Sequence, residues 1–175
     1  LCMIEHIDDV INAGVYSLKI EGRMKSPYYV AAVVKVYRQA VDEYMKDPEN
    51  YKAKPEWMES LMKVSHRRYH TGFYYGKSET QIFDSSSYIR NADIVGVVRE
   101  YDENTKIATI EQRNKVFEGD VVEVLRPEGS PFNVTLKDMR ENSGEKIENA
   151  PRAQMLFKVQ VETPLKPKDM LIKEK

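Results

Sequence analysis

The chain has 175 residues, a hydrophobic fraction of 41% and 27 basic against 28 acidic residues. This length allows one ordinary domain or two small ones, and the balanced charge excludes a polybasic protein that binds nucleic acid by bulk neutralisation of phosphates. The sequence contains no signal-peptide pattern and no apolar run near the ~20 residues that cross a bilayer. Its single cysteine excludes an internal disulfide framework and fits a reducing cytoplasm.

The first alternating segment lies close to the N-terminus. Residues 5–13 predict the end of a helix, because Gly14 is a typical residue just past a helix C-terminus. Residues 15–21 then alternate in hydrophobicity, which predicts a β-strand. We expect one face of this strand to pack against helices and the other to point into a barrel. The first face carries Tyr16, Leu18 and Ile20, and the second carries Val15, Ser17, Lys19 and Glu21.

Two longer helices are predicted next. Ser26 is a suitable N-cap and Pro27 suits the first helical position, so a helix should run from there to about residue 45. Its expected apolar face has spacings of three or four and consists of Val30, Val34, Tyr37, Val41 and Tyr44. A second helix should begin near Pro55, with an apolar face of Trp57, Leu61 and Val64.

The pattern changes from helical to alternating after a predicted linker at residues 84–87. Strands are predicted at 94–99, 106–112, 120–126, 132–137, 154–161 and 169–173. Short strands separated by polar turns are typical of a small antiparallel β-barrel, closed or partly closed. We therefore expect an α+β chain with one domain over residues 1–84 and a β-barrel domain over residues 88–175.

The first candidate site is the end of the predicted strand at residues 15–21. Barrel enzymes carry their catalytic groups at the rim formed by strand C-termini, where Glu21, Arg23 and the preceding Lys19 would lie. A carboxylate beside a guanidinium can orient an anionic substrate. The alternative is an ordinary exposed ion pair at the end of a surface strand, which is common and contributes little energy.

The second candidate site is the acid-free segment 63–77. Arginines beside aromatic rings are typical of contacts with single-stranded RNA or nucleobases. The alternative is a helix C-terminus whose cations complement the helix dipole, followed by a loop packed by aromatic side chains. A metal site is disfavoured, since no acidic or cysteine ligand accompanies the two histidines of the segment. The candidate RNA-binding residues are His66, Arg67, Arg68, Tyr69 and Phe73.

Residues 17–31, with the sequence SLKIEGRMKSPYYVA, closely resemble the collagenase-like peptidase family U32. Residues 2–5, 11–15 and 65–73 resemble the same family in the same order, and the remainder resembles its C-terminal β-barrel. The resemblance implies that residues 1–84 are the end of a TIM-barrel-like catalytic domain, followed by an accessory docking barrel. We expect the chain to be the C-terminal part of a longer protein and to be inactive in isolation.

The resemblance implies two kinds of activity for the full-length protein. Some members are described as collagen-degrading proteases; others support hydroxylation of the wobble uridine of transfer RNA, a branch in which prephenate is implicated. Related members hold an iron–sulfur cluster on four cysteines, so Cys2 would be a possible ligand in the full-length protein only. No proteolytic nucleophile–base set is recognisable, so we favour RNA hydroxylation over proteolysis, with a non-enzymatic interaction module as a third alternative.

The expected partners follow from these alternatives. The full-length protein would bind RNA, and transfer RNA in particular, or a protein substrate, and it would not bind membranes. The incomplete barrel would expose Leu18, Ile20 and the apolar face of residues 30–44. We expect repacking or self-association to cover this surface.

Overall fold

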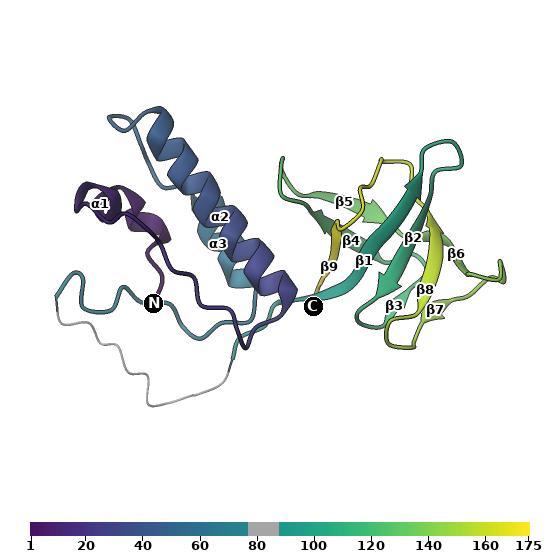
Figure 1. Cartoon of the computed structure of the whole chain (residues 1–175). Helices are drawn as coiled ribbons and strands as arrows, with labels where there is room; N and C mark the ends of the chain where they lie inside the picture. Colours follow the sequence, from purple (N-terminus) through teal and green to yellow (C-terminus); the bar gives the residue numbers. More distant parts are fainter. Residues whose placement is uncertain (77–87) are drawn as a thin grey trace. The chain divides into compact units, whose positions relative to one another are not determined.

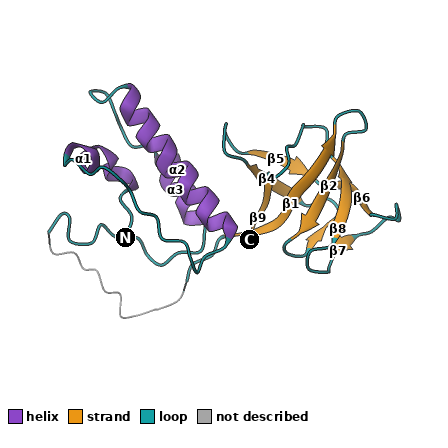
Figure 2. Ribbon diagram, in the orientation of Figure 1, coloured by secondary structure: helices purple, strands orange, loops and turns teal. Residues whose placement is uncertain are grey.

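The computed structural model describes residues 1–76 and 88–175, which belong to two compact units, Leu1–Asn91 and Ala92–Lys175 (Figure 1). The regular elements of the first unit are helices, and those of the second are strands (Figure 2). The helical elements are η1 (Ile4–His6), α1 (Ile7–Asn12), α2 (Pro27–Lys46) and α3 (Pro55–Lys63). The predicted linker at residues 84–87 lies outside the described residues.

The predicted start of α2 is confirmed. The Ser26 hydroxyl accepts a hydrogen bond from the Tyr29 backbone N–H at 3.2 Å, and Pro27 occupies the first helical turn. The predicted apolar face is partly wrong, since Val30 and Val34 are exposed. Small residues allow α2 to approach its neighbours closely, so the buried face is instead formed by Tyr28, Ala32, Val33, Val36, Ala40 and Tyr44.

The predicted face of α3 is confirmed. Trp57 and Leu61 are buried, and so is Val64 immediately after the helix. The α3 helix contacts α2, and both contact η1, so the buried faces of the helices share one interior. No helix in the described parts of the chain is long and apolar enough to cross a membrane.

The predicted strand at residues 15–21 is wrong. The structure places this segment in no regular element, and Tyr16, expected to pack against helices, is fully exposed. A strand persists only where its N–H and C=O groups pair with a neighbouring strand, and no described residue pairs with this segment as a strand. Alternation alone therefore does not produce a strand here.

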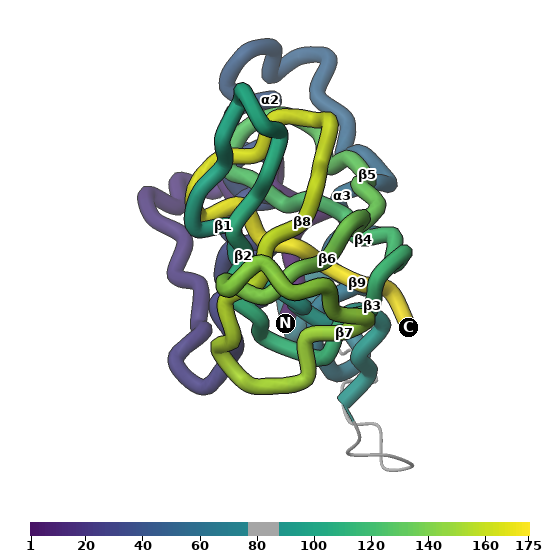
Figure 3. Tube along the Cα trace, turned by 90° about the vertical axis from the view of Figure 1, so that its right-hand side faces the viewer, coloured from purple at the N-terminus to yellow at the C-terminus, as the bar shows by residue number. Residues whose placement is uncertain are grey.

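The second unit is a curled, seven-stranded antiparallel sheet, which confirms the predicted small antiparallel barrel, partly closed (Figure 3). The sheet consists of β1 (Ala92–Asp102), β2 (Ile107–Gln112), β4 (Val121–Leu125), β5 (Phe132–Thr135), β6 (Lys137–Glu141), β8 (Leu156–Gln160) and β9 (Met170–Glu174). Its strand order is β5-β4-β9-β1-β2-β8-β6, and β3 (Val116–Phe117) pairs with β7 (Asn149–Ala150) separately. The predicted strand at 132–137 corresponds to β5 and ends where β6 begins, so β6 was missed, as were the short β3 and β7.

Strand β1 lies at the middle of this sheet and carries two register shifts. One lies between Ile94 and Gly96 against β9, and the other between Val98 and Glu100 against β2. A Cβ at Gly96 would lie 2.5 Å from the Ile110 side chain, so this close approach of strands requires glycine. Shifts of this kind bend a strand, which lets the sheet curl around its buried side chains.

Candidate functional site

A cavity of about 820 Å³ lies within the first unit. The segment 15–21 forms part of its lining, together with the N-terminal residues, α2 and several tyrosines. Lys19 and Glu21 both line it, as does Cys2. The cavity thus brings together four of the candidate residues, with Tyr69 as the fourth, although the strand expected to carry Lys19 and Glu21 is absent.

The contacts of Glu21 differ from the expected ion pair. One Glu21 carboxylate oxygen accepts a hydrogen bond from the backbone N–H of Arg23 at 2.9 Å, which closes a tight turn. No ion pair between the two side chains occurs among the described residues, and both side chains are exposed. Glu21 and Lys19 therefore place opposite charges at the cavity, while the Arg23 guanidinium is available for an external anion.

Cys2 is held at the cavity from two sides. Its backbone N–H donates to the carbonyl of His70 at 2.9 Å, and its sulfur accepts a hydrogen bond from the Tyr37 hydroxyl at 3.7 Å. The side chain is buried, with the residue 8% exposed. Burial also raises the pKa of Tyr37, so its hydroxyl remains a donor.

The chain does not fit an iron–sulfur cluster by itself. Such clusters are held by four thiolates, and the sequence contains one cysteine. No group of three or more potential ligands that could hold a metal ion occurs in the described part of the chain. Cys2 could contribute only one ligand.

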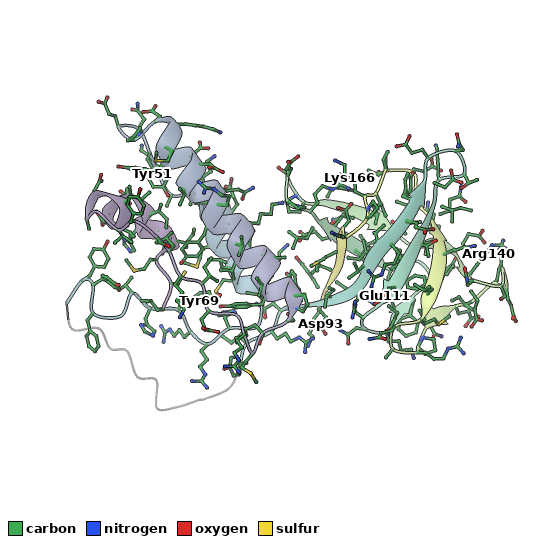
Figure 4. The ribbon with its side chains drawn as sticks, in the orientation of Figure 1. Tyr51, Tyr69, Asp93, Glu111, Arg140 and Lys166 are labelled. Atoms are coloured by element: carbon green, nitrogen blue, oxygen red, sulfur yellow. The ribbon has the colours of Figure 1, made fainter. Side chains whose placement is uncertain are left out.

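His66 and Tyr69 belong to the packed interior of the first unit. His66 is 3% exposed, and its Nδ1 donates to the Val64 carbonyl at 2.7 Å, since a carbonyl can only accept. Its ring stacks on that of Tyr69, which is labelled in Figure 4. The Tyr69 hydroxyl donates to the Leu61 carbonyl at 2.9 Å. Burial raises the pKa of Tyr69. These contacts fix the end of α3 to the loop that follows it.

Arg67, Arg68 and Phe73 have the exposure that an RNA contact requires. Phe73 is 77% exposed, and both arginines are exposed. The Arg67 guanidinium lies 5.0 Å from the centre of the Tyr88 ring. Tyr88 was missed by sequence reasoning, because it lies far along the chain from Arg67 and no local pattern connects the two.

Tyr75 is a second residue that sequence reasoning missed, and it lines the cavity. Its hydroxyl donates to the Asp9 carboxylate, and its ring lies 4.5 Å from that of His6. The hydrogen bond to Asp9 raises the pKa of Tyr75 to about 12. Tyr75 thus connects the acid-free segment to α1 at the edge of the cavity.

Comparisons with known proteins match both halves of the chain. Residues 1–84 match the model of peptidase family U32, and residues 90–171 match that of the peptidase family U32 C-terminal domain. A crystal structure of the C-terminal domain of a Geobacillus thermoleovorans protein described as a U32 peptidase is 30% identical, with a TM-score of 0.44. The match covers 47% of this chain and 92% of that one.

Curated relatives carry two kinds of name. The "tRNA hydroxylation protein P1" of Bacillus subtilis is 39% identical over 100% of this chain and 42% of its own length. The Escherichia coli "tRNA hydroxylation protein P" is 33% identical over 85% of this chain and 32% of its own length. A Porphyromonas gingivalis "Collagenase" is 26% identical over 96% of this chain and 41% of its own length. The chain thus spans less than half the length of these relatives, and it belongs to peptidase family U32.

Proposed function

We propose that the protein acts in the hydroxylation of transfer RNA, at the wobble uridine. The observation that carries this proposal is the 39% identity to a tRNA hydroxylation protein along the whole chain. A second such protein, from a different bacterium, is 33% identical over 85% of the chain. The collagenase relative matches a similar share of the chain at only 26% identity.

Within this function, we propose that the first unit contributes to the substrate site and that the second unit is a docking module. Lys19 and Glu21 place a cation and an anion at one cavity, and the exposed Arg23 lies just beyond them. Such a set can orient an anionic small molecule, and prephenate is the candidate that family resemblance supplies. For an iron–sulfur cluster, Cys2 would be this chain's one contribution, with the other three thiolates supplied from outside these residues.

The RNA would contact the exposed members of the acid-free segment 63–77. Arg67 and Arg68 are positioned to bind phosphates, and the exposed ring of Phe73 offers a stacking face. His66 and Tyr69 would act indirectly. The His66 Nδ1 and the Tyr69 hydroxyl each donate a hydrogen bond to a backbone carbonyl. They hold the loop that presents the arginines.

Deletion of the gene, followed by mass spectrometry of the nucleosides of purified transfer RNA, tests the function. We expect hydroxylated wobble uridine to fall on deletion and to return when the wild-type gene is restored. Restoration with Glu21→Gln should recover less of it than restoration with Glu49→Gln, a control at an exposed residue between α2 and α3.

A peptidase is the competing function, supported by the collagenase relatives. Purified protein incubated with gelatin tests it directly. Unchanged wobble hydroxylation in the deletion strain, together with gelatin cleavage that Glu21→Gln abolishes, would replace the RNA function by proteolysis. We also expect the 175-residue chain alone to leave gelatin intact, because barrel active sites assemble groups from several strand ends.

A further inference from the structure

Two acid-free segments meet at the N-terminal end of α2. Residues 22–41 and 60–76 contain no aspartate or glutamate. The Lys25 ammonium group joins them, because it donates a hydrogen bond to the Ser65 carbonyl at 3.2 Å. Basic residues that lie apart in the sequence therefore gather on one part of the first unit.

The ring of Tyr88 orders two of these cations. The Lys25 ammonium lies 4.1 Å from the ring centre, and the Arg67 guanidinium lies 5.0 Å from it. Paired backbone hydrogen bonds between His66 and Ile89, of 3.1 and 2.9 Å, bring Tyr88 beside Arg67. A cation held over an aromatic face keeps its full charge, whereas a cation bound to a carboxylate is neutralised.

Several cations elsewhere in the described chain are bound to carboxylates. On α2 itself, Arg38 binds Asp42, and in the second unit Arg126 binds Asp169 and Lys173 binds Asp120. By contrast, no described carboxylate forms an ion pair with any residue of the basic patch. We define this patch as Arg23, Lys25, Arg67 and Arg68, with Tyr88 between Lys25 and Arg67.

The position of the patch raises its positive potential further. Lys25 directly precedes the N-cap Ser26 of α2, and Arg23 lies two residues before Lys25. The first turn of this helix contains no acidic residue. The N-terminus of a helix carries partial positive charge, so cations are unfavourable there and anions favourable. The sequence thus places positive charge where it opposes helix stability and would strengthen the binding of an anion.

We propose that the basic patch binds the phosphate backbone of transfer RNA, which deepens and rests on the proposed function. Arg23, Arg67 and Arg68 are exposed, and Lys25 is half-buried beside them. Cations without a carboxylate partner match a chain of phosphates and position it without reading its sequence. Tyr88 carries cations on its ring, so its part is to order Lys25 and Arg67. The RNA-binding surface thereby extends beyond the segment 63–77 to Arg23, Lys25 and Tyr88.

The double variant Arg23→Ala/Arg68→Ala tests the patch without disturbing the fold. Both side chains are exposed, and neither has a hydrogen bond or ion pair from its side chain to a described residue. The matched control is Lys46→Ala/Lys52→Ala, which removes the same charge from two exposed residues, the last residue of α2 and one in the loop that follows it. A helix of 20 residues is about 30 Å long, so the control lies well outside the patch.

Binding of an unmodified transfer RNA transcript is measured by fluorescence anisotropy over a range of salt concentrations. Loss of two phosphate contacts should raise Kd roughly tenfold or more near 0.1 M salt and reduce the slope of log K against log salt by about 1.4 to 1.8. The control pair should change neither quantity. Thermal midpoints of both variants should match the wild type.

The variant Tyr88→Leu separates ordering from charge. It keeps all four cations, so the salt slope should stay unchanged. Kd should rise because Arg67 loses the ring that orders it, while Lys25 keeps its contacts with the Ser65 carbonyl and the Tyr29 ring. An equal loss of transcript affinity in Arg23→Ala/Arg68→Ala and in Lys46→Ala/Lys52→Ala would overturn the proposal, because it would show that the protein attracts RNA through its general charge.

Two further results distinguish the patch from the function itself. Wild-type binding that survives unchanged in Arg23→Ala/Arg68→Ala would overturn the patch and leave the tRNA function standing. If the wild-type protein does not bind the transcript even at low salt, both the patch proposal and the proposed tRNA function lose transfer RNA as the partner. Tight binding of polyglutamate instead would identify an acidic protein as the partner and overturn the RNA proposal.

Discussion

The Tyr37 hydroxyl donates to the sulfur of Cys2 and accepts a hydrogen bond from the backbone N–H of the adjacent Met3 at 2.9 Å. One phenol in the middle of α2 thus fixes two consecutive residues of the N-terminal segment. On its other side, Cys2 is bonded through its backbone to His70. The cysteine at the cavity is therefore positioned by both α2 and the acid-free segment.

Replacing Tyr37 by phenylalanine should release Cys2. The change removes both hydrogen bonds and leaves the Met3 N–H without its partner, which should lower the free energy of unfolding by about 1–2 kcal/mol. The buried thiol should also react faster with a disulfide reagent, because its segment is less firmly held. Denaturant titration and thiol-reaction kinetics measure the two effects.

The matched control for this variant is Tyr16→Phe, which removes the hydroxyl of a fully exposed tyrosine. It should leave stability and thiol reactivity at wild-type values. Equal thiol reactivity in Tyr37→Phe and the wild type would show that Tyr37 does not hold Cys2.

Replacing Tyr51 by phenylalanine should not lower the free energy of unfolding, in contrast to Tyr37→Phe. The Tyr51 hydroxyl is buried and has no hydrogen-bond partner among the described residues, so its removal should leave stability unchanged or raise it by up to about 1 kcal/mol. Burial, followed by the charges of Asp8 and Glu43, raises the pKa of Tyr51 to about 12 from 10.0. A clear loss of stability in denaturant would contradict this account.

The raised pKa also predicts the behaviour at alkaline pH. Because the folded-state value is the higher one, the contribution of neutral Tyr51 is complete below pH 10.0 and is lost as the pH rises through about 12. Tyr51→Phe should remove this loss. The difference in phenolate absorbance between wild type and variant should have its midpoint near the higher value, and a midpoint near 10.0 would contradict the burial.

The barrel could be predicted largely from the sequence, because period-2 alternation and polar turns locate strands that find partners within the chain. The start of α2 followed from Ser26 and Pro27 for a similar local reason. The prediction of a strand at residues 15–21 was wrong because an alternating run becomes a strand only when it pairs with a neighbouring strand. The sequence pattern of the run does not contain that information. The prediction of the buried face of α2 was partly wrong because close packing of the helix buries Ala32 and Ala40, which rank low on hydrophobicity.

The candidate site was predictable only where it is local in the sequence. The acid-free character of residues 63–77 identified the exposed Arg67 and Arg68. It did not separate them from His66, which lies buried in the same run and bonds to the Val64 carbonyl. The contacts of Lys25 and Arg67 with Tyr88 join three distant parts of the chain, and only the fold brings them together.

The acid stability of the barrel should depend on Asp138. Hydrogen bonds from Arg140 and then Lys146 hold the pKa of this carboxyl below 3.8. A folded-state pKa below the unfolded value means that the stabilisation is present above pH 3.8 and is lost as the pH falls through the folded value. Asp138→Asn should therefore flatten the fall of the thermal midpoint in acid. Glu128→Gln, at an exposed turn residue, is the control, and an acid profile of Asp138→Asn that matches the wild type would contradict the prediction.

The Glu118 side chain should be essential for holding β6 to the turn between β3 and β4. The neighbouring Gly119 and Asp120 pair with Leu136, which lies between β5 and β6, through backbone hydrogen bonds of 2.8 and 3.0 Å. The Glu118 carboxylate then accepts from the backbone N–H groups of Asp138 and Met139 at 3.0 and 2.7 Å. A side chain thus continues the ladder where Asp138, with φ of 49°, leaves the extended conformation.

Glu118→Gln should break this arrangement, because an amide has one acceptor oxygen and would turn its own NH₂ group toward the second backbone donor. Leaving that donor unsatisfied should cost about 1–3 kcal/mol in denaturant titrations. Hydrogen exchange should accelerate at the Asp138 or the Met139 amide, whichever faces the new NH₂ group, and should not accelerate at Val159 of β8. Glu100→Gln, an exposed glutamate on β1, should change neither measurement. Wild-type stability with protected Asp138 and Met139 amides in Glu118→Gln would show that the backbone pairing of Gly119 and Asp120 with Leu136 holds this turn in place without the carboxylate.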